Sequence, residues 1–202
     1  MSAEEYLKDI SEIKNLMNKS SRFISLSGIS GILAGLYALI GAAIVYWLVS
    51  TNCDNYLVLH SKTFTHVLLV ALAVLSLSIL TAILLTTKKA KRNNEKIWDA
   101  TTKRLLSSFL IPLIAGGIYI IIILAQGKYG HTGALMLIFY GIALFSASKH
   151  TLSFVKYLGL SEIILGLISA LFPGLGFWFW VIGFGFLHII YGIIMHFKYD
   201  KN

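Results

Sequence analysis

Long apolar runs separated by short polar segments dominate this chain. Six runs are present, at about 23–49, 65–87, 105–125, 134–148, 157–172 and 175–197. A helix needs about 20 mostly apolar residues to cross the hydrocarbon core of a bilayer, and the fourth and fifth runs are near the lower limit. Pro173 and Gly174 predict a tight turn between the last two runs. The pattern predicts an all-α, polytopic membrane protein whose domain 23–197 has six transmembrane helices arranged as three hairpins.

Composition supports the same class of protein. The chain is 57% hydrophobic and 13% charged, with a mean hydropathy of +0.78. Soluble domains are about a quarter charged. The net charge of +8 falls between the apolar runs rather than on a soluble surface. The expected partner is therefore the lipid bilayer, and no nucleic acid is expected.

The lysines and arginines predict one orientation. If the N-terminus is cytoplasmic, 15 of the 17 basic residues lie in cytoplasmic segments, and only Lys62 and Lys128 lie outside. Cytoplasmic loops of membrane proteins are enriched in these residues. We therefore expect a multi-pass protein of the bacterial inner membrane with both termini cytoplasmic, including the tail 198–202.

Residues 1–22 form a polar segment that precedes the first run. Ala3, Tyr6, Ile10, Ile13 and Met17 recur at three- and four-residue spacing, which predicts an amphipathic helix over 2–20. Such a helix either lies at the cytoplasmic membrane surface or joins two protomers as a coiled coil.

The segment 88–104 predicts a basic cytoplasmic loop. It is interpreted either as a contact for anionic lipids or a protein partner, or as a determinant of topology alone. The residues that would make such a contact are Lys88, Lys89, Lys91, Arg92, Lys103 and Arg104.

Small residues recur at helical spacing within the runs. Small side chains let membrane helices approach closely, so we expect helix packing at these positions within the chain or between protomers of a homo-oligomer. They are Ser27, Gly31, Gly35, Gly159, Gly166, Gly185 and Gly192.

Glu162 is the one acidic residue, of nine, that falls inside an apolar run. An ionisable residue in a membrane span indicates a functional site. His188 in the last run is its expected partner, because the two residues lie at similar distances from the turn at Pro173. Both sit in the pattern G-x-x-Z-x-x-x-G, at 159–166 and 185–192. If the two glycine faces meet, the side chains meet in the cytoplasmic half of the membrane.

Two interpretations of this intramembrane polar pair remain open. A carboxyl beside an imidazole can take up and release a proton near neutral pH, which would serve proton- or solute-coupled transport. Alternatively the pair is a structural clasp, or His188 bonds a carbonyl or Ser161 instead.

Other polar residues indicate no chemistry. Ser76, Ser78, Thr81, Tyr119 and Tyr140 are expected to make interhelical hydrogen bonds. No motif predicts a catalytic residue, a cofactor or a metal site, and we do not expect an enzyme.

The glycine patterns carry two resemblances. The stretches GLSEIILGLISALFPG and WVIGFGFLHIIYGIIM resemble the short-repeat acid-resistance membrane proteins of bacteria. The stretches RFISLSGISGILAGLYALIGA, LMLIFYGIALFSASKHTL, YLGLSEIILGL and GFGFLHIIYGIIMHFKY resemble an uncharacterised six-span membrane protein family of Bacteroidota. Neither resemblance implies a catalytic motif.

Two classes of function follow. The first is small-solute or proton-linked transport, or a membrane stress response, that uses Glu162 and His188. The second is a noncatalytic membrane anchor or regulatory subunit that binds a partner through its basic cytoplasmic face.

Overall fold

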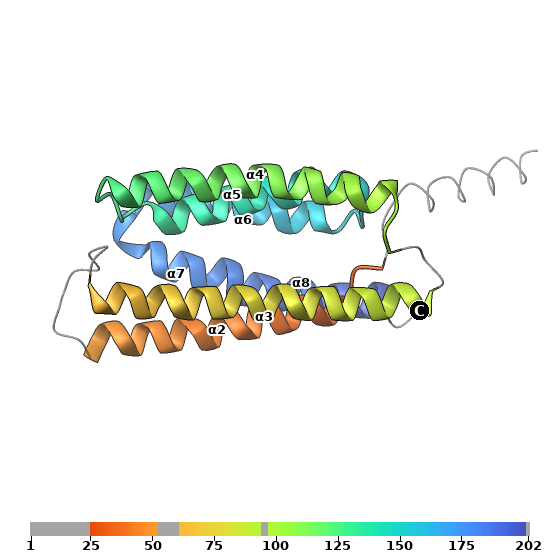
Figure 1. The fold of residues 1–202 in the computed structure, drawn as a ribbon, viewed down its shortest axis with the longest axis horizontal. Helices are drawn as coiled ribbons and strands as arrows, with labels where there is room; N and C mark the ends of the chain where they lie inside the picture. Colours follow the sequence, from red (N-terminus) through yellow and green to blue (C-terminus); the bar gives the residue numbers. More distant parts are fainter. Residues whose placement is uncertain (1–24, 52–60, 94–96, 201–202) are drawn as a thin grey trace, which may run out of the picture.

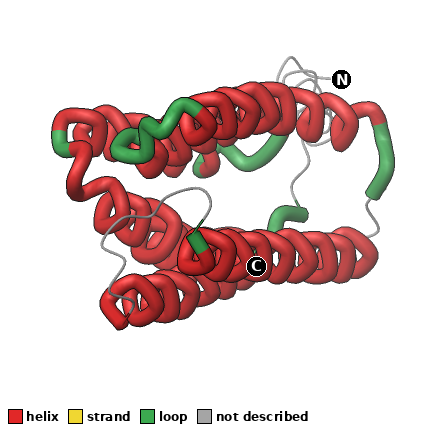
Figure 2. Tube along the Cα trace, turned by 60° about the vertical axis from the view of Figure 1, so that its left-hand side comes forward, coloured by secondary structure: helices red, strands yellow, loops and turns green. Residues whose placement is uncertain are grey.

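Figures 1 and 2 show a bundle of long helices in the computed structural model, which describes residues 25–51, 61–93 and 97–200. The expected helix over 2–20 and the last two residues lie outside the described residues. The elements are α2 (Gly28–Thr51), α3 (Lys62–Arg92), α4 (Ala100–Ala125), α5 (Thr132–Ala147), η1 (Ser148–His150), α6 (Val155–Leu171), η2 (Pro173–Leu175), α7 (Gly176–Trp180), η3 (Val181–Leu187), α8 (His188–Met195) and η4 (His196–Asp200).

The helices are those of a multi-pass membrane protein. Five are long and apolar enough to cross a bilayer: Gly28–Thr51, Lys62–Arg92, Ala100–Ala125, Thr132–His150 and Pro173–Tyr199. The last of these joins η2, α7, η3, α8 and most of η4 into one continuous C-terminal helix. Helix α6 is shorter, with 17 residues.

The distribution of side chains agrees with a lipid environment. Large apolar residues cover the outside, and within α3 only Thr63 and Ala90 are buried. The interior holds small residues such as Ala38, Ala134 and Ala143. An apolar exterior of this extent would aggregate in water, whereas in lipid it is the solvated surface.

The helices form two layers (Figure 1). One layer contains α2, α3 and the C-terminal helix, and the other contains α4, α5 and α6. Helix α6 packs mainly on α5, and α8 packs on α2. The packing therefore differs from three separate hairpins, because the last helix leaves α6 and joins the first.

Glycines bring α2 and the C-terminal helix into close contact. A Cβ atom at Gly28 would lie 2.7 Å from the Gly192 carbonyl oxygen, and one at Gly35 would lie 2.6 Å from that of Gly185. A Cβ at Gly31 would lie 3.3 Å from the Gly192 Cα. The expected stripe of small residues thus packs within the chain, with Ser27 also buried.

A second crossing, between α5 and α6, repeats the first. A Cβ at Gly159 would lie 2.8 Å from the Gly141 carbonyl oxygen, and one at Gly166 would lie 3.0 Å from that of Ala134. Each contact residue lies seven positions from its neighbour on the same helix, as Gly28 lies from Gly35 and Gly185 from Gly192. The crossing of α2 with the C-terminal helix and the crossing of α5 with α6 therefore have the same seven-residue spacing between contact residues.

The basic segment 88–104 is largely helical rather than a loop. Helix α3 continues to Arg92, where lysine and arginine suit the negative end of the helix dipole. Helix α4 begins after Asp99, whose Oδ1 accepts a hydrogen bond from the Thr102 amide at 2.7 Å. That backbone hydrogen bond holds the pKa of Asp99 below its ordinary value. The connection that remains spans residues 93–99.

One end of the bundle, here called the basic end, carries most of the lysines and arginines that the structure describes. It comprises the end of α3, the start of α4, the turn between α5 and α6, and the C-terminus (Figure 1). Lys89 crosses between helices there, since its Nζ donates to the Leu26 carbonyl at 2.9 Å. The other cations expected to contact anionic lipids or a partner are exposed: Lys88, Lys91, Arg92, Lys103 and Arg104.

Substitution at the glycine crossings tests this packing. We expect Gly141→Ala to lower stability in detergent by about 1–3 kcal/mol, the usual cost of overpacking. The added Cβ would lie 2.6 Å from the Gly159 carbonyl oxygen and 2.7 Å from Ile163 Cγ1. The matched control is Gly117→Ala on α4, where no atom lies within 4 Å of the added Cβ. Equal thermal unfolding temperatures for the two variants would contradict the crossing.

Candidate functional site: a buried carboxyl and imidazole

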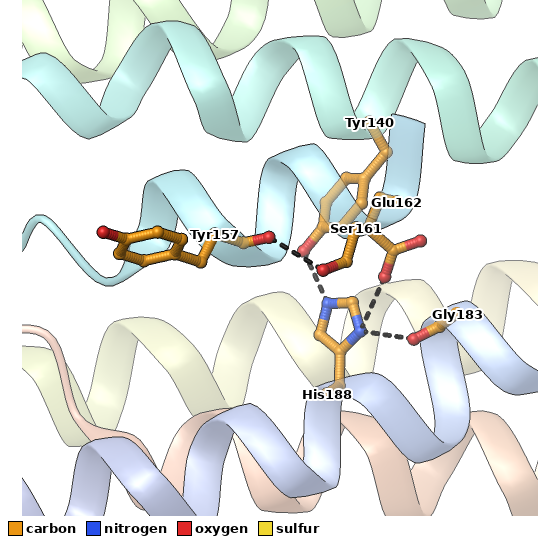
Figure 3. A network of polar contacts seen from close by, with 6 residues as sticks. All are labelled: Tyr140, Tyr157, Ser161, Glu162, Gly183 and His188. Atoms are coloured by element: carbon orange, nitrogen blue, oxygen red, sulfur yellow. Dashed lines mark hydrogen bonds and ion pairs between the residues drawn. The ribbon is translucent and has the colours of Figure 1, made fainter. Parts of the chain in front are cut away.

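Glu162 of α6 has no exposed surface. Its side chain points from one helix layer toward the other (Figure 3). Neither carboxyl oxygen has a hydrogen-bond partner among the residues that the structure describes. Oε1 lies 3.5 Å from Nδ1 of His188, its nearest charge partner. The structure therefore brings together the two residues that the sequence pairs.

His188 lies at the junction of η3 and α8, and is 6% exposed. Its ring makes two further contacts (Figure 3). Nδ1 lies 3.0 Å from the carbonyl oxygen of Gly183, five residues earlier. Nε2 lies 2.8 Å from the Tyr140 hydroxyl of α5. The imidazole thus joins α5, α6 and the C-terminal helix.

These contacts assign the tautomer of His188. A carbonyl oxygen only accepts hydrogen bonds, so Nδ1 must carry the proton that faces Gly183. When the ring is neutral, Nε2 accepts from the Tyr140 hydroxyl; when it is cationic, Nε2 donates to the same oxygen. A second proton can therefore be taken up at Nε2 without moving the ring.

The π-helical segment η3 shapes the histidine side of the site. A π-helical turn is wider than an α-helical turn and occurs often at functional sites. Here it contains Gly183 and Gly185, both buried. The Gly183 carbonyl lies on this widened part of the helix, and it reaches the ring of His188, the first residue after the segment.

Glu162 and His188 meet by a route that differs from the expected one. The glycine face of α6 packs on α5, and that of the C-terminal helix packs on α2, so the two faces do not meet. Glu162 instead crosses the gap between the layers and lies against Gly183. A Cβ at Gly183 would lie 2.6 Å from Glu162 Oε2, so only glycine leaves room for the carboxyl group.

Aromatic rings close the site on the side away from the basic end. Phe184 stacks on His188 with ring centroids 5.6 Å apart and on Trp180 at 5.1 Å. The Tyr140 ring lies 4.9 Å from Phe184. These rings fix the orientation of the imidazole and exclude water from that side.

Burial limits the charge states of the pair. An isolated ionised carboxylate costs several kcal/mol to bury, and an opposite charge nearby offsets much of this cost. With one titratable proton to share, the pair is neutral overall, either as acid and imidazole or as carboxylate and imidazolium. Removing that proton leaves a net negative charge inside the bundle. The arrangement therefore favours holding one proton.

Of the alternative partners, a carbonyl oxygen does lie at hydrogen-bond distance from His188, that of Gly183, whereas Ser161 and the nearby cation Lys156 make their contacts elsewhere. Ser161 Oγ donates to the Tyr157 carbonyl at 2.9 Å, within its own helix (Figure 3). The Lys156 ammonium lies 5.7 Å from the centroid of the Phe145 ring. In the described part of the chain, no three His, Cys, Asp or Glu side chains gather as metal ligands; Cys53, Asp54 and His60 lie outside it.

Two members of the site were not assigned to it from sequence. Tyr140 was expected only to bond between helices, as Thr81 does with Tyr37 at 3.3 Å. Gly183 carried no prediction, although its place five residues before His188 is visible in the sequence. The π-helical segment contains Gly183, whose carbonyl lies near the His188 ring, and we identify no sequence signal for this segment.

No protein-family model, curated protein or solved structure matches this chain. Its function is therefore argued from its own residues.

Removal of one hydroxyl tests the hydrogen bond to His188. We expect Tyr140→Phe to lower the free energy of unfolding by about 1–2 kcal/mol, because it leaves buried Nε2 without a partner. The measurement is reversible unfolding in mixed micelles. Tyr119→Phe is the control: Tyr119 is exposed to lipid, and its hydroxyl has no hydrogen bond to the described residues. Equal losses in both variants would contradict the bond.

Proposed function

We propose that the chain crosses the membrane six times, with the basic end and both termini in the cytoplasm. Helix α6 is about 25 Å long at 1.5 Å per residue, slightly short of the hydrocarbon thickness of about 30 Å. It runs beside α5 through the Gly159 and Gly166 contacts, and its far end continues into Pro173, which lies near Gly130. A helix that follows a spanning neighbour along its length spans with it.

For this protein the favoured function is proton-linked transport, of protons alone or with a small solute. One observation carries this proposal: a fully buried carboxyl without a hydrogen-bond partner lies 3.5 Å from an imidazole inside the membrane domain. A clasp that served only structure would satisfy its acceptor oxygens, since unpaired buried polar groups destabilise a fold. Intramembrane carboxyl and imidazole groups are typical of proton relays.

One proton changes the net charge of the pair from −1 to zero. In the unloaded state Glu162 is a carboxylate and His188 is neutral, so the pair has a charge of −1. A proton arriving at Nε2 gives an imidazolium beside the carboxylate, and the proton on Nδ1 can then pass to Glu162, which leaves the ring neutral with its proton on Nε2. Loading cancels the buried charge, and release to the opposite side restores it. The resemblance to acid-resistance membrane proteins agrees with a role in proton movement.

A second candidate function rests on the basic end. Lys91, Arg92 and Arg104 are exposed near the polar boundary of the helices, where cations bind anionic lipid headgroups or an acidic protein partner. In this alternative the protein is a membrane anchor or regulatory subunit, and Glu162 and His188 only stabilise it. The transport experiment below separates the two candidates.

The topology predicts opposite labelling of two single cysteines placed on either side of α6. In a Cys53→Ser background, Gly174→Cys should react with a membrane-impermeant thiol reagent added outside spheroplasts. Lys149→Cys should react only after the membrane is permeabilised. Both residues are exposed. Labelling of both from the same side would show that α6 does not cross.

The transport function predicts a proton flux that depends on Glu162. Purified protein in liposomes with a trapped pH dye and an inside-negative potassium potential should acidify the lumen faster than empty liposomes do. Glu162→Gln keeps the shape of the side chain but cannot titrate, and His188→Gln keeps a group that can donate to Gly183. We expect each to reduce the flux at least about tenfold, since positioned proton-transfer groups contribute about 10²–10⁴-fold.

Asp99→Asn is the matched control for this flux. It also removes one carboxylate, but asparagine is an equally good helix N-cap, so α4 should begin normally. The flux of this variant should equal that of the unsubstituted protein. Full flux in Glu162→Gln would overturn the proposal, and unchanged abundance and unfolding temperature in that variant would exclude misfolding as the cause of a loss.

A further inference from the structure

A cavity of about 150 Å³ lies between the two layers beside His188. It is lined by residues of both layers, including Ser30, Ala34, Ala82, Tyr140, His188 and Tyr191. A buried water needs roughly 10–15 Å³ of such space, so the cavity has room for several. Its inner end is formed by Tyr140 and His188, which hydrogen-bond each other.

The polar groups of the lining can hold water. The Tyr191 hydroxyl is buried and has no hydrogen-bond partner among the described residues. The Ser30 hydroxyl donates to the Ser27 carbonyl at 2.6 Å and keeps its acceptor capacity. A buried hydroxyl without a protein partner destabilises the fold unless water satisfies it. The cavity thus has both the volume and the hydrogen-bonding groups that internal water requires.

The cavity lies on one side of the acid–imidazole pair. Its lining comes from the parts of the helices nearest the basic end, such as Leu26 at the start of α2 and Met195 at the end of α8. On the other side of His188, Phe184 stacks on Trp180, and Leu137 and Glu162 both pack on Gly183. Open space therefore adjoins the pair toward the basic end, and dense packing adjoins it away from that end.

We infer that this cavity is a hydrated vestibule that connects water at the basic end to His188. A proton from this water would then pass by way of the Tyr191 and Tyr140 hydroxyls to His188 Nε2. The inference rests on the proposed proton-linked function for its purpose, but it specifies what that function leaves open. The transported species enters as water-borne protons.

Silver ion accessibility tests the vestibule without any measurement of transport. In a Cys53→Ser background, Ser30→Cys should react with Ag⁺ applied to the basic-end side of oriented membrane vesicles. The readout is loss of later alkylation after denaturation. Ser169→Cys is the control, because Ser169 is also a buried serine but lies beyond Glu162 and does not line the cavity. It should not react. If neither cysteine reacts with Ag⁺, or if only Ser169→Cys reacts, the inference is overturned.

A cavity-filling substitution then links the vestibule to flux. Ala82→Leu adds three carbon atoms to the lining and should reduce proton flux in liposomes severalfold, whereas Ala73→Leu on the exposed face of the same helix should leave it unchanged. If Ser30→Cys reacts but the unsubstituted protein carries no protons, the proposed function fails and the hydrated cavity stands. If protons flow but Ala82→Leu has no effect, the cavity is not their route and the inference fails.

Discussion

The close approach of glycine-bearing helices is the constraint on which this structure depends. Lipid supplies no hydrophobic force between helices, so contact between backbones must hold them together. At Gly28 with Gly192, and at Gly141 with Gly159, even one added carbon would collide with the facing helix. These two crossings fix α8 on α2 and α6 on α5. Only because the two helices are held in different layers can Glu162 and His188 approach each other across the gap between them.

Because the two crossings have the same spacing of contact residues, equivalent positions in them can be compared, and the differences show where the two crossings are not alike. Aligning Gly28 with Gly159 places Glu162 opposite Gly31, and aligning Gly192 with Gly141 places His188 opposite Leu137. The repeat alone therefore requires no polar group at these positions. Gly31 instead lines the cavity, where it contributes no side chain. The crossing of α5 and α6 thus carries the carboxyl group, and the crossing of α2 and the C-terminal helix leaves open space next to the imidazole.

Sequence patterns predicted the position of each helix and the depth of its residues, but they did not predict which helices pack against each other. Each apolar run corresponds to a helix, because the large apolar side chains that make up the run are the ones that cover the outside of that helix. Glu162 and His188 could be paired because rise per residue fixes depth. The partners of the glycine faces could not be read, since Gly159 fits against Gly141 by the same geometry that would fit it against Gly185. Gly183 escaped notice because its role depends on the π-helical turn and on the Glu162 carboxyl.

Between the layers the contacts are fewer, and a close glycine contact of the same kind lies at one end. Gly133 packs on Gly176 at one end, and Leu152, Val155 and Met195 cluster at the basic end. Between these lie Glu162, His188 and the cavity. Each layer is held internally by glycine contacts that tolerate no added atom, whereas the interface between the layers also contains open space and a pair of titratable groups. In transporters that alternate access by rocking one bundle against another, the binding site lies at such an interface. Under the proposed function, a proton that neutralises the pair would also remove a buried charge from that interface, which would couple the stability of the contact between the layers to the protonation of the site.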